Sequence, residues 1–147
     1  MSNVQEVAIG GFNLSGFKIL VVDDIETNLT IMSKRLPQEG YEVVIARNGS
    51  DGVKQAIKHL PDLILLDLKM PVLSGWDALN KLRENEKTKS IPVIAISATI
   101  TDKDAAKIER HGFNGYCAKP FKIGEFISKI DDWLLPSDDE LEEIGVW

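Results

Sequence analysis

The residues of this sequence that could carry out chemistry cluster at the ends of four short apolar runs. These residues are Asp23, Asp24, Asp67, Ser97 and Lys119. Three carboxylates at close range raise one another's pKa, so positive charge is needed to keep them ionised. Lys119 supplies one positive charge, and a divalent cation would supply the rest. Carboxylate oxygens suit Mg²⁺, which keeps several waters and takes one or two protein carboxylates plus a phosphate oxygen.

This set of groups matches the needs of phosphoryl transfer, in which catalysis is mostly positioning and charge neutralisation. In this interpretation Asp67 is the nucleophile and forms an aspartyl phosphate. Mg²⁺ and Lys119 would each take one phosphoryl oxygen. Ser97 would donate a hydrogen bond to a third oxygen.

Each residue also has a simpler interpretation. Asp23 or Asp24 could be a helix N-cap, Asp67 could start a turn, and Ser97 could cap the segment that follows it. Lys119 could be an ordinary loop lysine. We favour one shared site, because a helix cap uses a single aspartate and because all of these residues fall at strand ends.

The elements that must position these residues alternate between strand and helix. Short, β-rich apolar runs of this length are typical of strands buried on both faces. The expected strands are Phe17–Val22, Val43–Ala46, Leu63–Leu66, Val93–Ile96 and Tyr116–Ala118.

Apolar residues between these runs recur at helical spacing, most clearly from Ile123 to Leu134. The helix expected around Asp102–His111 has few apolar residues, so we expect it to be the most exposed. Pro37 should end or bend the first helix near Leu36.

Five strand and helix units in succession predict an α/β fold with a parallel sheet and helices on both of its faces. Crossovers between parallel strands are right-handed almost without exception. In such folds ligands bind beyond the carboxyl ends of the strands. The five residues above should therefore share one crevice.

Composition excludes several classes of protein. The chain has 147 residues and a net charge of −6, so net charge will not draw it to nucleic acid. A single cysteine, Cys117, excludes an internal disulfide and a cysteine-rich zinc site, and is expected to be a small core residue. There is neither a membrane-spanning apolar run nor a signal peptide, so a cytoplasmic protein with no membrane partner is expected.

Charge and glycine placement predict three regions. Residues 1–16 form a flexible N-terminal segment, residues 17–135 the folded domain, and residues 136–147 an acidic C-terminal tail. The tail holds five of the 23 acidic residues and no basic one. It is either a solvated end or a segment anchored on a groove through its four large apolar residues, Leu141, Ile144, Val146 and Trp147.

The order and spacing of the motifs resemble a response-regulator receiver domain of two-component signalling, of the single-domain type. The matching segments are KILVVDD, LILLDLKMPVLSG, AISA and GYCAKPF, and the likeness as a whole extends from about Phe17 to Leu134. Asp67 and Ser97 are 30 residues apart, and Ser97 and Lys119 are 22 apart, which also fits.

The resemblance implies a flavodoxin-like (βα)5 fold with strand order 2-1-3-4-5. It implies that a histidine kinase or a histidine phosphotransfer protein phosphorylates Asp67. Mg²⁺ would be held by Asp24, Asp67 and the backbone carbonyl of Lys69, with Asp23 acting chiefly through water.

The resemblance also implies how the phosphoryl group is held and read. Ser97, Lys119 and the backbone of Ala98 would bind it, and Lys69 and Thr99 would flank it. Ser97 and Tyr116 would move together as a switch. The face formed by the fourth helix, fifth strand and fifth helix would then change shape and bind a downstream protein. The peptide bond before Pro120 is often cis in this family.

Rival functions remain open at this point. The chain could be a receiver excised from a hybrid histidine kinase, or a receiver that binds without being phosphorylated. A haloacid-dehalogenase-like phosphatase would need Asp-x-Asp after the first strand, and Asp24-Ile25-Glu26 is only a near miss. A flavin carrier would need a phosphate loop where the acidic DDIETN stands. As a receiver, the protein would not be an enzyme, since it would catalyse only its own phosphorylation and dephosphorylation.

Overall fold

Strands and helices alternate along the chain in the computed structural model of the protein, which describes residues 8–9, 12–13, 16–98, 100–119 and 122–134. The strands are β1 (Ala8–Ile9), β2 (Phe12–Asn13), β3 (Lys18–Val22), β4 (Glu42–Ala46), β5 (Leu63–Asp67), β6 (Val93–Ser97) and β7 (Gly115–Ala118). The helices are α1 (Glu26–Gln38), α2 (Gly49–His59), α3 (Gly75–Glu84), α4 (Asp102–His111) and α5 (Ile123–Leu134).

Five strands form one parallel sheet in the order β4-β3-β5-β6-β7. Counted from β3, this is the flavodoxin-like order 2-1-3-4-5, and the predicted fold class is confirmed. The strand order reverses between the paired strands β3 and β5, so the loops after them lead to helices on opposite faces of the sheet, α1 and α3. In folds of this kind ligands bind at that point of the carboxyl edge.

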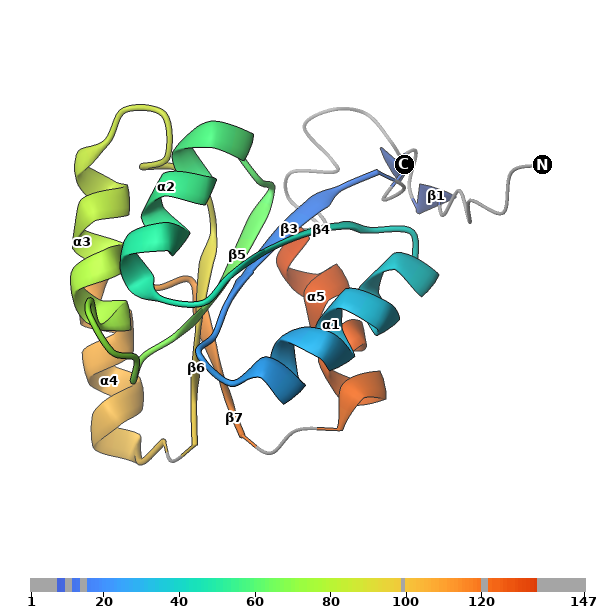
Figure 1. Ribbon diagram of the computed structural model, residues 1–147. Helices are drawn as coiled ribbons and strands as arrows, with labels where there is room; N and C mark the ends of the chain where they lie inside the picture. Colours follow the sequence, from blue (N-terminus) through green and yellow to red (C-terminus); the bar gives the residue numbers. More distant parts are fainter. Residues whose placement is uncertain (1–7, 10–11, 14–15, 99, 120–121, 135–147) are drawn as a thin grey trace.

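Helices cover both faces of the sheet, as predicted (Figure 1). One core joins α1 and α5 to residues such as Ile19 and Leu65, and the other joins α2, α3 and α4 to residues such as Leu20 and Leu66. Successive strand residues point to opposite faces, so each strand contributes to both cores. Because both faces of each strand are covered, the strands are continuous apolar runs in the sequence. Cys117 belongs to the first core, as expected.

Several boundaries differ from the prediction for local reasons. Asp67 and Ser97 are the last residues of their strands, because Asp67 pairs with Ile96 and Ser97 with Ala118. Pro37 lies in the last turn of α1, which ends at Gln38, two residues later than expected. A proline in the last turn removes only one backbone hydrogen bond, so the helix tolerates it there.

The two ends of the chain were predicted as separate regions. The paired strands β1 and β2 were not foreseen, because each has only two residues and shows no periodicity. The rest of the predicted flexible segment, apart from Gly16, and the whole acidic tail with its anchoring residues lie outside the described residues. The domain boundaries therefore stay predictions.

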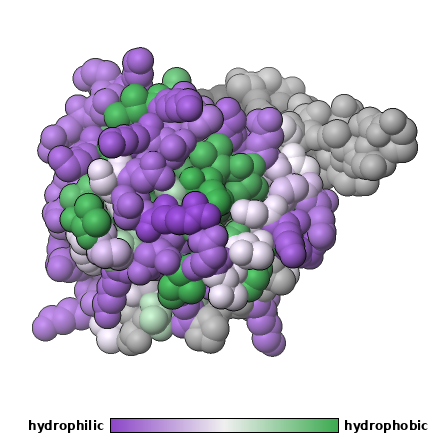
Figure 2. Space-filling view, viewed as in Figure 1, coloured by the Kyte–Doolittle hydropathy of each residue, from purple (hydrophilic) through white to green (hydrophobic). Residues whose placement is uncertain are grey.

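The surface of the domain is mostly hydrophilic, because its apolar residues are buried in the two cores. Hydrophilic side chains cover most of the face seen in Figure 2, and hydrophobic residues show there in separate patches. Only Ile108 is fully buried in α4, the helix that we expected to be the most exposed. No helix in the described part of the chain is long and apolar enough to cross a membrane.

Candidate functional site

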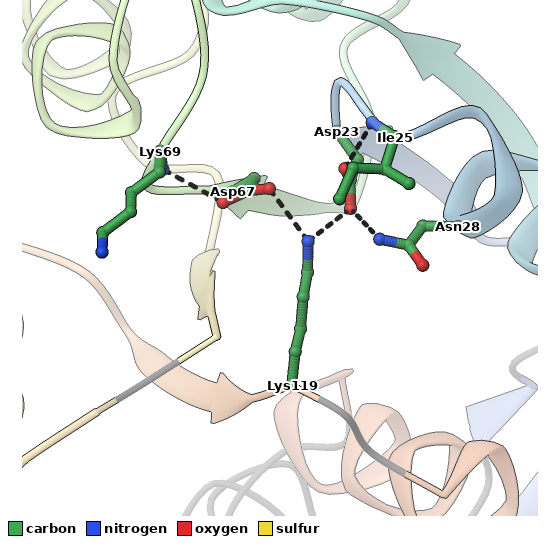
Figure 3. A network of polar contacts seen from close by, with 6 residues as sticks. All are labelled: Asp23, Ile25, Asn28, Asp67, Lys69 and Lys119. Atoms are coloured by element: carbon green, nitrogen blue, oxygen red, sulfur yellow. Dashed lines mark hydrogen bonds and ion pairs between the residues drawn. The ribbon is translucent and has the colours of Figure 1, made fainter.

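Residues from three strands meet at the carboxyl edge of the sheet (Figure 3). Asp23 follows β3, Asp67 ends β5 and Lys119 follows β7. Lys119 Nζ lies 2.9 Å from Asp23 Oδ2 and 2.9 Å from Asp67 Oδ2, although 96 residues separate Lys119 from Asp23. We call the group of Asp23, Asp24, Asp67 and Lys119 the acidic notch.

Asp67 is held by the segment that follows it. The backbone N–H of Lys69 donates to Asp67 Oδ1 at 3.0 Å, and the Lys69 side chain points away from the notch (Figure 3). Gly75 packs against the backbone of the same aspartate, where a Cβ on residue 75 would lie 2.3 Å from the Asp67 carbonyl oxygen. Glycine is therefore required at position 75 for α3 to begin so close to the site.

The loop between β5 and α3 is tightly turned. Leu73 N–H donates to the Pro71 carbonyl at 2.8 Å, and Val72 between them has φ of +71°. A β-branched residue at positive φ is strained, and such strain gathers at functional sites. The Val72 side chain is 84% exposed, so no core packing explains the conformation.

Asp23 is buried and accepts hydrogen bonds on both oxygens. Ile25 N–H donates to Oδ1 at 2.9 Å, and the side-chain amide of Asn28 donates to Oδ2 at 3.1 Å. The simpler interpretation of Asp23 or Asp24 as a helix N-cap does not hold, because the N-cap of α1 is Ile25 and no side chain caps it. Ser97 does not cap α4 either, since Thr101 does so.

Asp24 completes a set of oxygen ligands. One carboxylate oxygen from each of Asp23, Asp24 and Asp67 lies within 4.8 Å of the others. Asp24 is exposed, whereas Asp23 and Asp67 are only 4% and 5% exposed. Hard oxygen ligands without nitrogen or sulfur suit Mg²⁺. Three carboxylates against one amine leave the notch with excess negative charge, so the residues fit a divalent cation.

The pKa values of both ion-pair partners are raised, but for different reasons. Burial raises the pKa of Asp67, and the hydrogen bonds from Lys119 and Lys69 only partly oppose this. Burial by itself would lower the pKa of Lys119, but the carboxylates of Asp23 and Asp67 outweigh it and raise that pKa above its usual value. Lys119 therefore stays protonated at neutral pH, and the notch keeps a fixed positive charge.

The remaining predicted residues lie on neighbouring elements. Ser97 is buried at the end of β6, and its carbonyl accepts from Lys119 N–H at 2.7 Å. Ala98 follows it and is exposed. Tyr116 lies on the edge strand β7 with 41% of its surface exposed. Thr99 and Pro120, including the predicted cis bond, lie outside the described residues.

Sequence reasoning missed two contributors to the notch. Asn28 lies one helical turn beyond Asp23-Asp24, and a polar residue at that spacing was the available signal. The contact of Gly75 with Asp67 was not predicted, because it depends on how α3 returns to the strand.

Comparison with known proteins gives consistent matches. The family model described as the response regulator receiver domain matches residues 19–131. The polar-differentiation response regulator DivK of Brucella anthropi is 33% identical over 116 residues, which are 79% of this chain and 94% of that protein.

Solved structures agree with the sequence matches. The receiver domain of the sensor histidine kinase PA1611 of Pseudomonas aeruginosa, solved with a magnesium ion in its active-site cleft, has a TM-score of 0.74 and 33% identity, over 82% of this chain and 98% of that one. The Vibrio cholerae chemotaxis protein CheY4 has a TM-score of 0.76 and 26% identity, over 82% of this chain and 100% of that one.

Proposed function

Because this chain belongs to the response regulator receiver domain family, we propose that it is a signalling switch that is phosphorylated on Asp67. One observation carries the choice of residue. Asp67 and Asp23 each lie 2.9 Å from Lys119 Nζ and belong to the same cluster of three carboxylates, but Asp23 already accepts three hydrogen bonds, from Ile25, Asn28 and Lys119. Asp67 accepts only two among the described residues, from Lys69 N–H and Lys119 Nζ, so it keeps more lone pairs for attack on phosphorus.

The proposed reaction is transfer from a phosphohistidine. An oxygen of Asp67 attacks phosphorus, the phosphorus–nitrogen bond breaks, and the donor imidazole leaves with the bonding electron pair and takes up a proton. When bound, Mg²⁺ neutralises charge on the phosphoryl oxygens. Asp24, Asp67 and the Lys69 carbonyl would hold the ion, and Asp23 would act chiefly through water.

Lys119 has a second role in this proposal. Phosphorylation adds about −1.5 to −2 charge to an already acidic notch. The Lys119 ammonium is already between two carboxylates, so it needs little movement to donate to a phosphoryl oxygen. Fixed donors of this kind lower the transition-state energy because they need no reorganisation. Ser97 and the N–H of Ala98 would take the other oxygens.

The proposed switch and output use Ser97 and Tyr116. Ser97 ends β6 at the same edge as Asp67 and is only 3% exposed, so the residue is largely shielded from solvent. Tyr116 is 41% exposed on β7, and we propose that it turns inward when Ser97 moves toward the phosphoryl group. The α4-β7-α5 face would then change and bind a downstream protein.

Two settings share this chemistry. DivK is a response regulator, whereas the PA1611 domain is part of a sensor histidine kinase. The chain therefore serves either as a separate regulator or as the receiver of a hybrid kinase, and its phosphodonor is a histidine kinase or a histidine phosphotransfer protein. In both settings it is a signalling module and not an enzyme acting on a separate substrate.

The test is incubation with Mg²⁺ and acetyl phosphate, read by intact mass. We expect one phosphoryl adduct per chain, lost in EDTA and in Asp67→Asn. Asp77→Asn, which changes an exposed aspartate of α3, is the matched control and should label normally. Repeated turnover of a phosphomonoester without an adduct would instead assign the notch to a phosphatase.

A further inference from the structure

Asn28 has a side chain aimed at the acidic notch from outside it. Asn28 lies in the first turn of α1 and is half-buried. Its Nδ2 donates to Asp23 Oδ2 at 3.1 Å, on the oxygen that also accepts from Lys119 Nζ (Figure 3). Neither the family motifs quoted above nor the proposed chemistry uses this residue.

Three donors fix the orientation of Asp23. Oδ1 accepts from Ile25 N–H, and Oδ2 accepts from Asn28 and Lys119. A carboxylate offers about four acceptor positions, so one remains. The rotation of Asp23 is therefore set before any ion arrives, and the remaining position is available for a cation or for its water.

Lys119 and Asn28 hold the same oxygen for different reasons. Lys119 also binds Asp67, so it draws Asp23 toward the centre of the notch. Asn28 comes from α1 and holds the carboxylate against that helix. Without Asn28, only Lys119 would hold Oδ2, and Asp23 could rotate to pair with the amine more closely. That rotation would compete with metal binding.

The amide is also suited by its lack of charge. A lysine or arginine at position 28 could donate the same hydrogen bond, but it would cancel one of the negative charges that attract a dication. An amide positions Asp23 and leaves the charge of the notch unchanged.

We propose that Asn28 is a positioning residue for the cation site: it holds Asp23 in the orientation that serves Mg²⁺ and so sets Mg²⁺ affinity. This inference rests on the proposed function only in that the notch binds Mg²⁺. Hydrogen-bond partners behind metal ligands typically change metal affinity about 10–100-fold when they are removed.

The experiment compares Asn28→Ala with Asn80→Ala, which truncates an exposed asparagine of α3. Mg²⁺ dissociation constants are measured by calorimetric titration of the full chain. We expect binding to Asn28→Ala to be about 10–100-fold weaker than to the unmodified chain. Asn80→Ala should bind as the unmodified chain does. Asn28→Gln, which keeps an amide donor, should fall between the two.

Two further measurements separate positioning from simple stabilisation of α1. In EDTA, hydrogen exchange of the Ile25 amide should become faster in Asn28→Ala, because its acceptor Asp23 is no longer fixed. The labelling rate of Asn28→Ala with acetyl phosphate should recover when Mg²⁺ is saturating.

The outcomes that overturn the inference differ from those that overturn the proposed function. If Asn28→Ala binds Mg²⁺ within twofold of the unmodified chain, or if its labelling stays slow at saturating Mg²⁺, Asn28 does not act through metal affinity. If the unmodified chain itself binds no Mg²⁺, the proposed function fails, whatever Asn28 does.

Discussion

Two half-buried cations, Lys119 and Arg83, stand at opposite edges of the sheet, and their partners differ in kind. At the carboxyl edge, Lys119 Nζ lies 2.9 Å from each of two carboxylates. At the amino edge, the described oxygens to which Arg83 of α3 donates are all neutral. These are the backbone carbonyls of Lys89 at 3.1 Å, Ile91 at 2.7 Å and Gly112 at 3.1 Å, and Asn114 Oδ1 at 2.9 Å.

The two environments shift the pKa values of Arg83 and Lys119 in opposite directions. Burial lowers the pKa of Arg83, and no acid offsets this. For Lys119 the two carboxylates outweigh burial, and its pKa rises. A guanidinium stays charged in spite of burial, whereas an ammonium in the same place would be far easier to deprotonate. Arg83 can therefore stay charged at the amino edge without a described acidic partner, because an arginine side chain keeps its proton in spite of burial.

Arg83 supports the structure of the domain, whereas Lys119 belongs to a binding site. Arg83 links the end of α3, the loop before β6 and the end of α4, and its two terminal nitrogens are fully engaged. The acidic notch keeps more negative than positive charge and so has capacity for another ligand. We infer that Arg83 holds the amino edge of the sheet in place, while the acidic notch at the carboxyl edge can bind a further ligand and change its charge.

Helix α4 runs between the two regions. At its C-terminal end, Gly112 is bound by Arg83, and His111 packs edge-to-face on Trp76 with ring centroids 4.9 Å apart. Lys107 Nζ also lies 4.6 Å from the Trp76 ring centroid. At its N-terminal end, the exposed Thr101 and the half-buried Asp104 cap the helix through each other. The end near Ser97 is therefore the less firmly held one.

Lys119→Met should show the largest effect. Removing the fixed donor should slow labelling by acetyl phosphate about 100–1000-fold. Mg²⁺ should bind more tightly than before, because three carboxylates remain without a cation. Rates from intact mass and a Mg²⁺ titration check both expectations. Lys122→Met, at an exposed lysine, is the control, and equal slowing in both variants would contradict the assigned role.

Arg83→Met should affect stability and leave the notch unchanged. Its loss leaves several backbone acceptors unpaired, so we expect the free energy of unfolding in urea to fall by about 2–3 kcal/mol. Mg²⁺ affinity should stay within twofold. Arg83→Lys should recover only part of the loss, because an ammonium cannot fork between four oxygens. The control is Arg110→Met, at an exposed arginine of α4. A large loss of Mg²⁺ affinity in Arg83→Met would contradict the idea that Arg83 supports the structure without affecting the acidic notch.

Gly75→Ala should affect both properties at once. The added Cβ would lie 2.3 Å from the Asp67 carbonyl oxygen, so α3 or the strand end must shift. We expect a loss of about 1–3 kcal/mol in unfolding free energy, together with weaker Mg²⁺ binding. Gly124→Ala in α5 meets nothing within 4 Å and should be neutral or stabilising. Unchanged Mg²⁺ binding in Gly75→Ala would show that the contact does not position Asp67.

Thr101→Ala should show the smallest effect, confined to one end of α4. Loss of an N-cap costs about 1 kcal/mol, so amides in the first turn of α4 should exchange hydrogen about fivefold faster. The amide of Gly112, at the end held by Arg83, should be unaffected. Thr30→Ala, at an exposed position of α1, is the control. Equal acceleration along the whole of α4 would contradict the idea that its two ends are held unequally.

The fold could be predicted from the sequence because a parallel sheet buries its strands on both faces. Continuous apolar runs such as Leu63–Leu66 follow directly from that burial, and right-handed crossovers then limit the topology. Boundaries were less accurate: Asp67 and Ser97 proved to be the last residues of their strands, because polar side chains at a strand end do not prevent backbone pairing.

The order of apolar runs along the chain is enough to bring Asp23, Asp67 and Lys119 to the carboxyl edge, since each of them ends such a run. The contacts that hold these residues depend on how distant elements pack together. Lys119 reaches two carboxylates because β7, β5 and β3 end at one edge, and Arg83 meets Gly112 because α3 and α4 end side by side. Hydrogen bonds act over about 3 Å. Their partners are therefore fixed by how separate elements pack, which no local pattern of residues records.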